Sequence, residues 1–403
     1  MKRRVWRFLA SLFLIVIATH PGYGEEKGVT KDKITVGVLS AFTGPYAEFG
    51  LNWSQGGKMV FDEVNASGGI YGRKIDYIAE DDACDSTKAS IAVKKLIHED
   101  KVFALYAGAC TPPVTAILPD VEAEKIPLQT ISASGSSFIP PWNKGPSAKY
   151  VFSGPLNQYN QGRSIVDFAL TRGFKKIAIL YQSDLWGTEA YRGAKSYIEK
   201  NGLKFVTEET ILRDATDSSV QVLKLKNVNP DAVLLVLYPR IGPIFMRQAY
   251  ELGLKSTFVS TQSMVLNLDT LRKTARDEAL TNYYYLWDEC DIWSGSGAPG
   301  CRVKEWVAKQ RKIFGDKANP FALAGVGSAN VFVEGLRRAG PDLTREKLIA
   351  ALESLRDFDT GVYSSKVTYS ANDHTTVRKA IFVKFSGAKE EVVYRPQKEF
   401  WGE

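Results

Sequence analysis

The stretch that decides the fold is ITVGVLSAFTGPYAEFGLNWSQGGKMVFDEVNASGG, residues 34–69. It begins with a short apolar run, Ile34–Leu39, which is typical of a buried strand. A loop rich in Gly and Pro follows, and apolar side chains then recur at helical spacing over Leu51–Asn65. Ser67–Gly69 is a helix C-terminal signal, and the next strand is predicted at Lys74–Ala79. A strand, a helix and a second strand in this order predict a βαβ unit with parallel strands.

The same rhythm continues along the chain. Further strands are predicted at Val102–Ala107, Ile126–Ile131, Lys176–Tyr181, Phe205–Ile211, Ala232–Leu237 and Thr257–Ser260, with helices at Thr87–Glu99, Pro113–Ala123, Gly187–Asn201, Ser219–Lys226 and Ile241–Leu252. The rhythm breaks near Ser153–Pro155, so we expect an α/β fold of two similar lobes with parallel sheets. Beyond them, residues 302–355 have helical patterning, and Val362–Tyr369 and Ala380–Phe385 alternate as strands do.

The N-terminus has the pattern of an export signal. Residues 1–7 are basic, residues 8–18 are apolar, and small residues follow up to Gly24. An apolar run of about eleven residues is too short for a bilayer span, which needs about 20. We therefore expect a signal peptide over 1–24 and a mature chain in the periplasm.

Composition excludes several classes of protein. The chain has 403 residues, 44% of them hydrophobic and 24% charged, which excludes wholesale disorder and suggests two or three domains. Cleavage after Gly24 removes four cations and no acid, so the formal charge falls from +7 to +3. The mature protein is therefore only mildly basic, and it has no stripe of Lys and Arg with interleaved aromatic residues. Nucleic acid is not expected as a partner.

The chain has four cysteines, Cys84, Cys110, Cys290 and Cys301. An even number in an exported protein indicates two disulfides. Of the three possible pairings, Cys84 with Cys110 and Cys290 with Cys301 closes the shortest loops, and it is the one that we expect. A zinc site is a weaker interpretation, because there is no CxxC and the chain has only three histidines.

No motif in the sequence indicates catalysis. HExxH, GxSxG and Walker A patterns are all absent, and the glycines of Gly68–Lys74 precede a strand, as in a tight turn. His374 lies in a polar stretch with Asn372 and Asp373, where we expect a solvated turn. We therefore predict no enzyme activity, no cofactor and no metal. A secreted hydrolase and a sensor remain the alternatives from other classes.

Two loops at successive strand ends have the chemistry of a binding site. Gly108–Pro113 places Thr111 at the start of a helix, and Ser132–Ser137 is small and rich in hydroxyls. A hydroxyl beside the N–H groups of a helix N-terminus favours an anion. Either loop alone is explained by helix capping. Together, at the carboxyl ends of neighbouring strands, they predict a site for a ligand carboxylate.

Several short motifs carry a resemblance to a known family. They are Thr43–Pro45 with Phe49–Gly50, Val64–Ile70, Asp81–Asp85, Cys110–Thr111, Ser132–Ser134 and Trp186–Gly187. From Lys33 to Phe385 the chain resembles the periplasmic leucine/isoleucine/valine-binding proteins, the type I solute receptors of ABC importers. The resemblance implies two Rossmann-like lobes with parallel sheets, joined by a hinge and closing on a ligand. In the family, the cysteines that match Cys84 and Cys110 are bridged, whereas a bridge matching Cys290–Cys301 is not a general feature.

The resemblance also implies boundaries, partners and site residues. We expect lobe 1 at 25–154 plus 283–358, lobe 2 at 155–282 plus 359–403, a monomer, and a permease of the inner membrane as partner. Cys110 and Thr111 resemble the carboxylate-binding helix N-terminus of the family, and Ala133 and Ser134 resemble its second clamp. The residues that resemble the lining of the side-chain pocket are Phe49, Trp186 and Tyr238, with Tyr46 beside the first of them.

Two departures from the family concern the ligand. Its amino-acid binders hold the ligand ammonium with acids, whereas the matching positions here are the amides Asn157 and Gln262. An amide oxygen accepts a hydrogen bond but carries no charge, and a buried ammonium without a charged partner costs several kcal/mol. The expected ligand is therefore a small carboxylate without an amine, with an aromatic acid as one form. The alternatives are a branched-chain or other amino acid, with Asp184 as the ammonium partner, and an amide or urea-type ligand.

Overall fold

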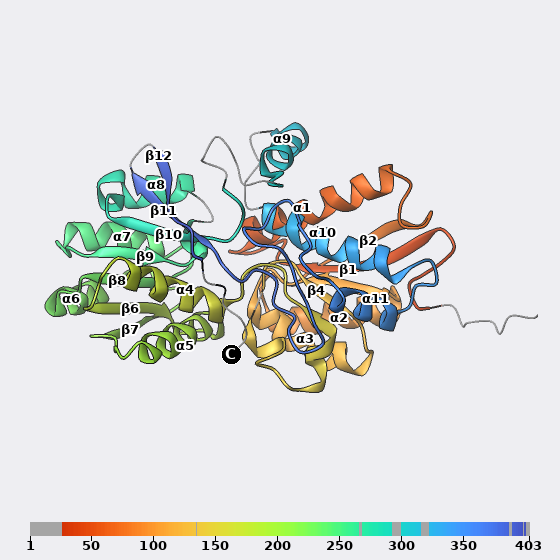
Figure 1. Cartoon of the computed structure of the whole chain (residues 1–403), viewed down its shortest axis with the longest axis horizontal. Coiled ribbons are helices and arrows are strands. Elements are labelled where there is room, and N and C mark those ends of the chain that lie inside the picture. The colour runs from red at the N-terminus through yellow and green to blue at the C-terminus, as the bar shows by residue number, and fades with distance from the viewer. Residues whose placement is uncertain are drawn as a thin grey trace, which may run out of the picture.

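The computed structural model describes residues 26–133, 135–265, 268–291, 300–315, 322–386, 389–397 and 399. The predicted signal peptide and Ser134 lie outside these residues. The described chain forms two lobes, each built on its own sheet, and they lie side by side in Figure 1. The predicted α/β class and the two-lobed architecture are confirmed. Among the described helices, none has both the length and the apolar composition that a bilayer span requires.

The first lobe has a five-stranded parallel sheet in the order β2-β1-β3-β4-β5. Its strands are β1 (Lys33–Ser40), β2 (Lys74–Asp81), β3 (Ala104–Ala107), β4 (Leu128–Thr130) and β5 (Val151–Phe152), and its helices are α1 (Ala47–Ala66), α2 (Ser86–Lys94), α3 (Thr111–Ala123), α10 (Ala322–Ala339) and α11 (Arg345–Glu353). Every residue of β1 after Lys33 is buried, because helices cover both faces of a parallel sheet. Helix α1 approaches α10 closely at Gly56, where an added Cβ would lie 1.9 Å from the carbonyl oxygen of Ala322.

The second lobe has a seven-stranded sheet in the order β12-β11-β10-β9-β8-β6-β7. Its strands are β6 (Ile177–Gln182), β7 (Glu208–Ile211), β8 (Ala232–Val236), β9 (Thr257–Ser260), β10 (Tyr283–Trp287), β11 (Ile381–Ser386) and β12 (Lys389–Tyr394), and its helices are α4 (Gln158–Thr171), α5 (Leu185–Lys200), α6 (Ser219–Val228), α7 (Gly242–Glu251) and α8 (Leu268–Ala275). Strands β6 to β10 pair in parallel, and β11 and β12 add an antiparallel edge.

The chain crosses between the lobes three times, and two crossings differ from the expected boundaries. The first crossing lies between β5 and α4, as expected. We expected residues from 283 onward in the first lobe, but β10 pairs with β9 and β11, so this crossing follows Trp287. We expected the last return at 359, but the chain rejoins the second sheet only at β11. Before β11, the segment around His374 packs against the first crossing, where the backbone N–H of Ser153 donates to the carbonyl oxygen of His374 (3.1 Å).

Two expectations for the C-terminal region are wrong. His374 is fully buried rather than solvated, because its Nδ1 lies 2.8 Å from the carbonyl oxygen of Val151 and its ring stacks on Phe152 at 4.1 Å. Val362–Tyr369 forms only isolated bridges, at Tyr363 with Glu289 and at Val367 with Phe358. Its alternation therefore reflects the burial of Val367 and Tyr369 and not a place in a sheet. The helical patterning of residues 302–355 corresponds to α9 (Val303–Phe314), α10 and α11.

Both predicted disulfides are present in the structure. Cys84 is bonded to Cys110, with 5.7 Å between their Cα atoms, and Cys290 to Cys301, with 6.1 Å. The first bridge ties the residue before α3 to the loop that follows β2. The second bridge lies where the chain has just left β10 for the first lobe.

Candidate functional site

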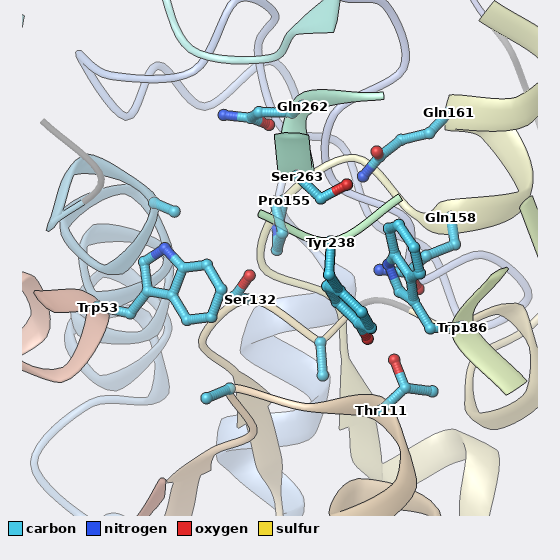
Figure 2. A pocket seen from close by; sticks show the side chains of 13 residues that line it. Trp53, Thr111, Ser132, Pro155, Gln158, Gln161, Trp186, Tyr238, Gln262 and Ser263 are labelled. Atoms are coloured by element: carbon cyan, nitrogen blue, oxygen red, sulfur yellow. The ribbon is translucent and has the colours of Figure 1, made fainter. Parts of the chain in front are cut away.

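A cavity lies between the two lobes, at the carboxyl ends of their parallel strands (Figure 2). Its empty volume is about 560 Å³, with solvent at the mouth included. Thirteen residues line it: Trp53, Ala109, Thr111, Ser132, Ala133, Pro155, Gln158, Gln161, Trp186, Tyr238, Gln262, Ser263 and Ala324. This is the place where open α/β sheets bind ligands.

The wall of this cavity contains no ionisable acid or base of the Asp, Glu, Lys, Arg or His type among its described residues. Its polar side-chain groups are three hydroxyls from Ser and Thr, three Gln amides, the phenol of Tyr238 and the indole N–H groups of Trp53 and Trp186. Its apolar surface comes mainly from Trp53 on one side and from Tyr238 and Trp186 on the other (Figure 2). A charged ligand therefore has only dipoles and hydrogen bonds as its immediate partners.

Helix α3 presents its N-terminus to the cavity. Cys110 precedes the helix with extended backbone, and Thr111 is the first helical residue, with its side chain directed into the cavity (Figure 2). Pro112 and Pro113 have no N–H, so the donors at this end are concentrated at Thr111. The bond between Cys84 and Cys110 holds this end of the helix in place.

Helix α4 also begins at the cavity. Asn157 caps it, with its Oδ1 accepting from the backbone N–H of Asn160 (2.8 Å). Gln158 and Gln161, from the first turn, line the wall, and Gln161 Nε2 donates to the carbonyl oxygen of Leu156 (2.9 Å). Asn157 itself does not line the cavity. Neither α3 nor α4 carries an acidic residue in its first turn, so the positive ends of both helix dipoles face the site without a side-chain anion.

Helix α5 differs, because an acid occupies its N-terminus. Asp184 caps it by accepting from the backbone N–H of Gly187 (2.9 Å). Burial raises the pKa of Asp184, while the Gly187 N–H and the charge of Arg213 oppose that rise. Asp184 does not line the cavity. Its geometry is that of a helix cap, and the sequence-based alternative that pairs it with a ligand ammonium has no contact at the cavity wall to support it.

Aromatic side chains form a continuous layer across the cleft. Trp186 and Tyr238 stack with ring centroids 4.3 Å apart, and Tyr46 from the other lobe meets Tyr238 edge-on at 5.7 Å. Phe49 lies 6.5 Å from Tyr46 and 5.8 Å from Trp53, measured between ring centroids. Tyr46 and Phe49 therefore lie behind the cavity wall and support the residues that form it.

An arginine joins the lobes beside this layer. Arg213 follows β7 in the second lobe, and its Nε donates to the hydroxyl of Tyr46 in the first lobe (2.5 Å). Its guanidinium lies 4.0 Å from the centre of the Tyr46 ring, and its Nη2 lies 2.9 Å from the Sγ of Cys84. Arg213 therefore contacts both Tyr46 and the disulfide that holds α3.

Gln262 lies at the other end of the cavity and has an acidic partner. Its Nε2 donates to Oε2 of Glu289 (2.7 Å), which is fully buried directly after β10. The adjacent Asp288 is also fully buried and accepts from the backbone N–H of Leu156 (2.9 Å). Burial raises the pKa of Glu289 well above its ordinary value, and the neighbouring Asp288 raises it further.

The predicted site residues divide into three groups. Thr111, Ala133, Trp186, Tyr238 and Gln262 lie in the cavity wall, whereas Tyr46, Phe49, Cys110 and Asn157 are not among its lining residues. Ser134 is outside the described residues.

Sequence reasoning missed several wall residues, most notably Trp53, Gln158, Gln161 and Ser263. Two signals were present in the sequence. Trp53 is four residues after Phe49, on the same side of a helix, and Gln158 follows the first crossing directly.

The comparison with known families decides the identity of this architecture. Residues 33–390 match the family described as periplasmic binding protein. The chain belongs to this family. Members of this family bind ligands and are not enzymes, as predicted from the sequence. The predicted relationship to the leucine/isoleucine/valine-binding proteins is confirmed, and it is a distant one.

Curated relatives are distant and carry several ligand names. The chain is 28% identical over 244 residues to an amino acid binding protein of Pseudomonas aeruginosa, covering 60% of this chain and 63% of that protein. It is 27% identical over 237 residues to the Leu/Ile/Val/Thr-binding protein of Salmonella typhimurium, covering 58% of this chain and 62% of that protein. The chain thus aligns with less than two thirds of the length of either relative.

Solved structures of transporter substrate-binding proteins share the fold. A fatty acid ABC transporter substrate-binding protein from Thermomonospora curvata matches with a TM-score of 0.79 and 23% identity, covering 92% of this chain and 93% of that one. A branched-chain amino acid transporter substrate binding protein from Streptococcus pneumoniae, in complex with isoleucine, matches with a TM-score of 0.74 and 21% identity, covering 90% and 99%. These likenesses establish the architecture and leave the ligand to be argued from the cavity.

Proposed function

We propose that this chain is the periplasmic substrate-binding protein of an ABC importer, and that it binds a small carboxylate without an amine. An aromatic acid is the form that the cavity fits best. The observation that carries the proposal is the cavity wall itself, which has no acid among its described residues and receives the N-termini of α3 and α4. The transport role is supported by family membership and by the names of the fold neighbours.

The electrostatics of the cavity favour an anion and disfavour a cation. Each helix N-terminus behaves as about half a positive charge, and its N–H groups bind carboxylates directly. A buried ammonium would have no carboxylate in the wall, which costs several kcal/mol. The N-terminus of α3 at Thr111 is the proposed anchor for the ligand carboxylate.

The shape of the cavity favours a flat apolar group. Trp53 faces Tyr238 and Trp186 across the cavity, and aromatic faces bind rings by offset or edge contacts (Figure 2). The three Gln amides offer neutral hydrogen bonds at the edge of such a group. No covalent chemistry is required for binding or release.

The proposed mechanism is closure of the hinge around the ligand. The ligand contacts both lobes, because Thr111 belongs to the first lobe and Trp186 to the second. Its differential affinity for the closed form shifts the equilibrium toward that form. The permease in the inner membrane then recognises the closed form and receives the ligand. We expect the chain to act as a monomer.

The test is a thermal-shift series on the mature chain beginning at Glu25. One ligand set contains branched-chain and aromatic α-amino acids, and the other contains their amine-free counterparts, including benzoates. A ligand at 100 times its Kd stabilises the protein by about 2.7 kcal/mol, which is a visible shift. Shifts with the amine-free set alone support the proposal, whereas shifts with the amino acids alone contradict the ligand class and keep the transport role.

A matched pair of variants tests the carboxylate anchor. Thr111→Val removes the hydroxyl that faces the cavity and keeps the shape of the side chain. Thr115→Val makes the same change one turn later on α3, where the hydroxyl donates to the carbonyl oxygen of Thr111 (3.1 Å). We expect ligand affinity to fall about 10-fold or more in the first variant, because a hydrogen bond to a charged group is lost. In the second variant, affinity should stay within about 3-fold of the wild type. Equal losses would contradict the anchor.

An amino-acid ligand is the second candidate, and one observation favours it. The buried acids Asp288 and Glu289 lie directly behind Gln262, so a negative charge is close to the cavity although no acid lines it. The names of the Pseudomonas aeruginosa and Salmonella typhimurium relatives point the same way. The same thermal-shift series separates the two candidates.

A further inference from the structure

The amide of Gln262 in the cavity wall is oriented by a hydrogen bond to a buried acid. Its Nε2 donates to Oε2 of Glu289 (2.7 Å), and among the described residues no protein group donates to its Oε1. Gln262 lines the cavity, and Figure 2 shows its amide oxygen nearer the centre of the cavity than its amide nitrogen. The cavity therefore meets an acceptor at this position and not a donor.

The partner that fixes this orientation lies outside the cavity wall. Glu289 is fully buried, its backbone bridges to Tyr363, and the next residue, Cys290, is held by a disulfide. An ionised carboxylate only accepts hydrogen bonds, so it pairs with the NH₂ end of the Gln262 amide and not with the oxygen end, as the contact with Oε2 of Glu289 shows.

The two ends of an amide have nearly the same size, so sterics do not decide which end faces the ligand. The hydrogen-bond partners decide it. We propose that Glu289 is a specificity-determining positioning residue, which turns the oxygen of Gln262 toward the cavity and makes the site select acids that carry a neutral hydrogen-bond donor, such as a hydroxyl, at that end. This inference rests on the proposed function, because it assumes that a small acid occupies the cavity.

The first experiment compares isomeric hydroxybenzoates with the matching fluorobenzoates by calorimetry. Fluorine is similar in size to a hydroxyl and donates no hydrogen bond. In the wild-type protein, at least one isomer should bind about 5- to 150-fold more tightly as the hydroxy acid, because the fluoro acid leaves a buried acceptor unpaired. In Glu289→Gln the partner can donate as well as accept, so the amide of Gln262 can take either orientation and this ratio should fall toward one. A wild-type protein that binds both members of every pair equally overturns the inference and leaves the proposed function standing.

A purely structural role of Glu289 predicts a different result. Both affinities would then fall together in Glu289→Gln, and an unchanged ratio would overturn the inference. If that variant does not fold, Gln262→Met provides the same test, because it removes the acceptor and keeps the length of the side chain. A hydroxyl preference that survives in Gln262→Met also overturns the inference.

A ligand-free measurement tests the hydrogen bond itself. The side-chain amide signal of Gln262 is assigned by NMR from its loss in Gln262→Met. We expect its protons to exchange slowly in the wild-type protein and to shift in Glu289→Gln. Fast exchange in the wild-type protein overturns the inference. If none of the benzoates binds, the proposed aromatic-acid ligand fails and the preference for a hydroxyl fails with it, while the NMR result still reports whether Glu289 orients Gln262.

Discussion

The carboxylate of Glu189, on α5 in the second lobe, accepts a hydrogen bond from the backbone N–H of Ser136 in the first lobe (2.7 Å). Its other oxygen accepts from the N–H of Ser137 (2.9 Å). The side chain is 1% exposed, so this pairing crosses the cleft in a region from which water is excluded. The structure thus contains a protein carboxylate that joins the lobes beside the proposed ligand cavity.

We expect Glu189 to favour the closed form. Glu189→Gln keeps the shape but replaces one accepting oxygen by an NH₂ group, which faces a backbone N–H. The loss of a charge-assisted hydrogen bond in this setting costs about 1–2 kcal/mol, so ligand Kd should rise about 5- to 30-fold. Calorimetry measures the affinity, and small-angle scattering measures the population of the open form. Glu199→Gln, at an exposed position of the same helix, is the control; equal effects in the two variants would contradict this role.

Much of the fold could be predicted from local patterns. Runs such as Ile34–Leu39 are buried on both faces, and each is followed by a helix, so periodicity alone indicates parallel βαβ units. The crossings after β10 could not be predicted, because the apolar run Tyr283–Trp287 is equally suitable as a buried strand of either sheet. The burial of His374 depends on contacts with Val151 and Phe152, more than 200 residues away in the chain. Such contacts leave no local signal.

The candidate site was predictable where loops follow strands and less so elsewhere. Thr111 and Ala133 follow successive strands, and the carboxyl ends of parallel strands meet at one edge of a sheet. Trp53 comes from the interior of α1, beside the close approach of α1 and α10 at Gly56 and Gly325, and local sequence does not show that it faces the cavity. Glu289 lies where the chain leaves β10, in a segment that the predicted boundaries assigned wholly to the first lobe. Its pairing with Gln262 in the second lobe could therefore not be predicted from the sequence.

Gln262→Glu should convert the cavity toward amine-bearing ligands. The new carboxyl group would lie within hydrogen-bond distance of Glu289, so one proton bridges the two groups and the remaining negative charge supplies the partner that an ammonium needs. A hydrogen bond to a charged group contributes about 1.5–3 kcal/mol. The affinity ratio of phenylalanine to 3-phenylpropanoate should therefore rise about 10-fold or more, as measured by calorimetry. Asn157→Asp is the matched control, because it keeps the cap of α4 and places its charge behind the wall. A larger rise in the control would assign the amine filter to Asn157.

The two disulfides should differ in their contributions to stability. In the chain-entropy description, a loop of 26 residues gives about 3.5 kcal/mol and a loop of 11 residues about 2.8 kcal/mol. The Cys84→Ser/Cys110→Ser variant should therefore lose slightly more stability than the Cys290→Ser/Cys301→Ser variant in urea unfolding. It should also lose more ligand affinity, because Cys110 precedes Thr111. Equal ligand affinities in the two double variants would show that the bond between Cys84 and Cys110 does not contribute to ligand binding.

Two neighbouring acids beside the Cys84 loop should respond to pH with opposite signs. Asp82 is fully buried, its Oδ1 accepts from the backbone N–H of Cys84 (2.7 Å), and burial raises its pKa to about 6. For Asp81, burial alone would raise the pKa. Hydrogen bonds from the hydroxyl of Thr43 and from the backbone N–H groups of Ala83, Phe42 and Thr43 outweigh burial, so the pKa of Asp81 is lowered.

The signs follow from proton linkage. The folded protein holds the Asp82 proton more tightly than the unfolded chain does, so Asp82 makes stability fall as the pH rises from about 4 to about 6. Asp82→Asn should then match the wild-type stability near pH 4 and exceed it at pH 7, by at most about 3 kcal/mol. Asp81 contributes stability above its ordinary pKa that is lost on acidification, so Asp81→Asn should be less stable than the wild type at pH 7 and should approach it as the pH falls. Urea unfolding of both variants at pH 4, 5, 6 and 7 measures these differences, and a loss of stability at pH 7 in Asp82→Asn would show that its carboxylate is stabilised by partners and not penalised by burial.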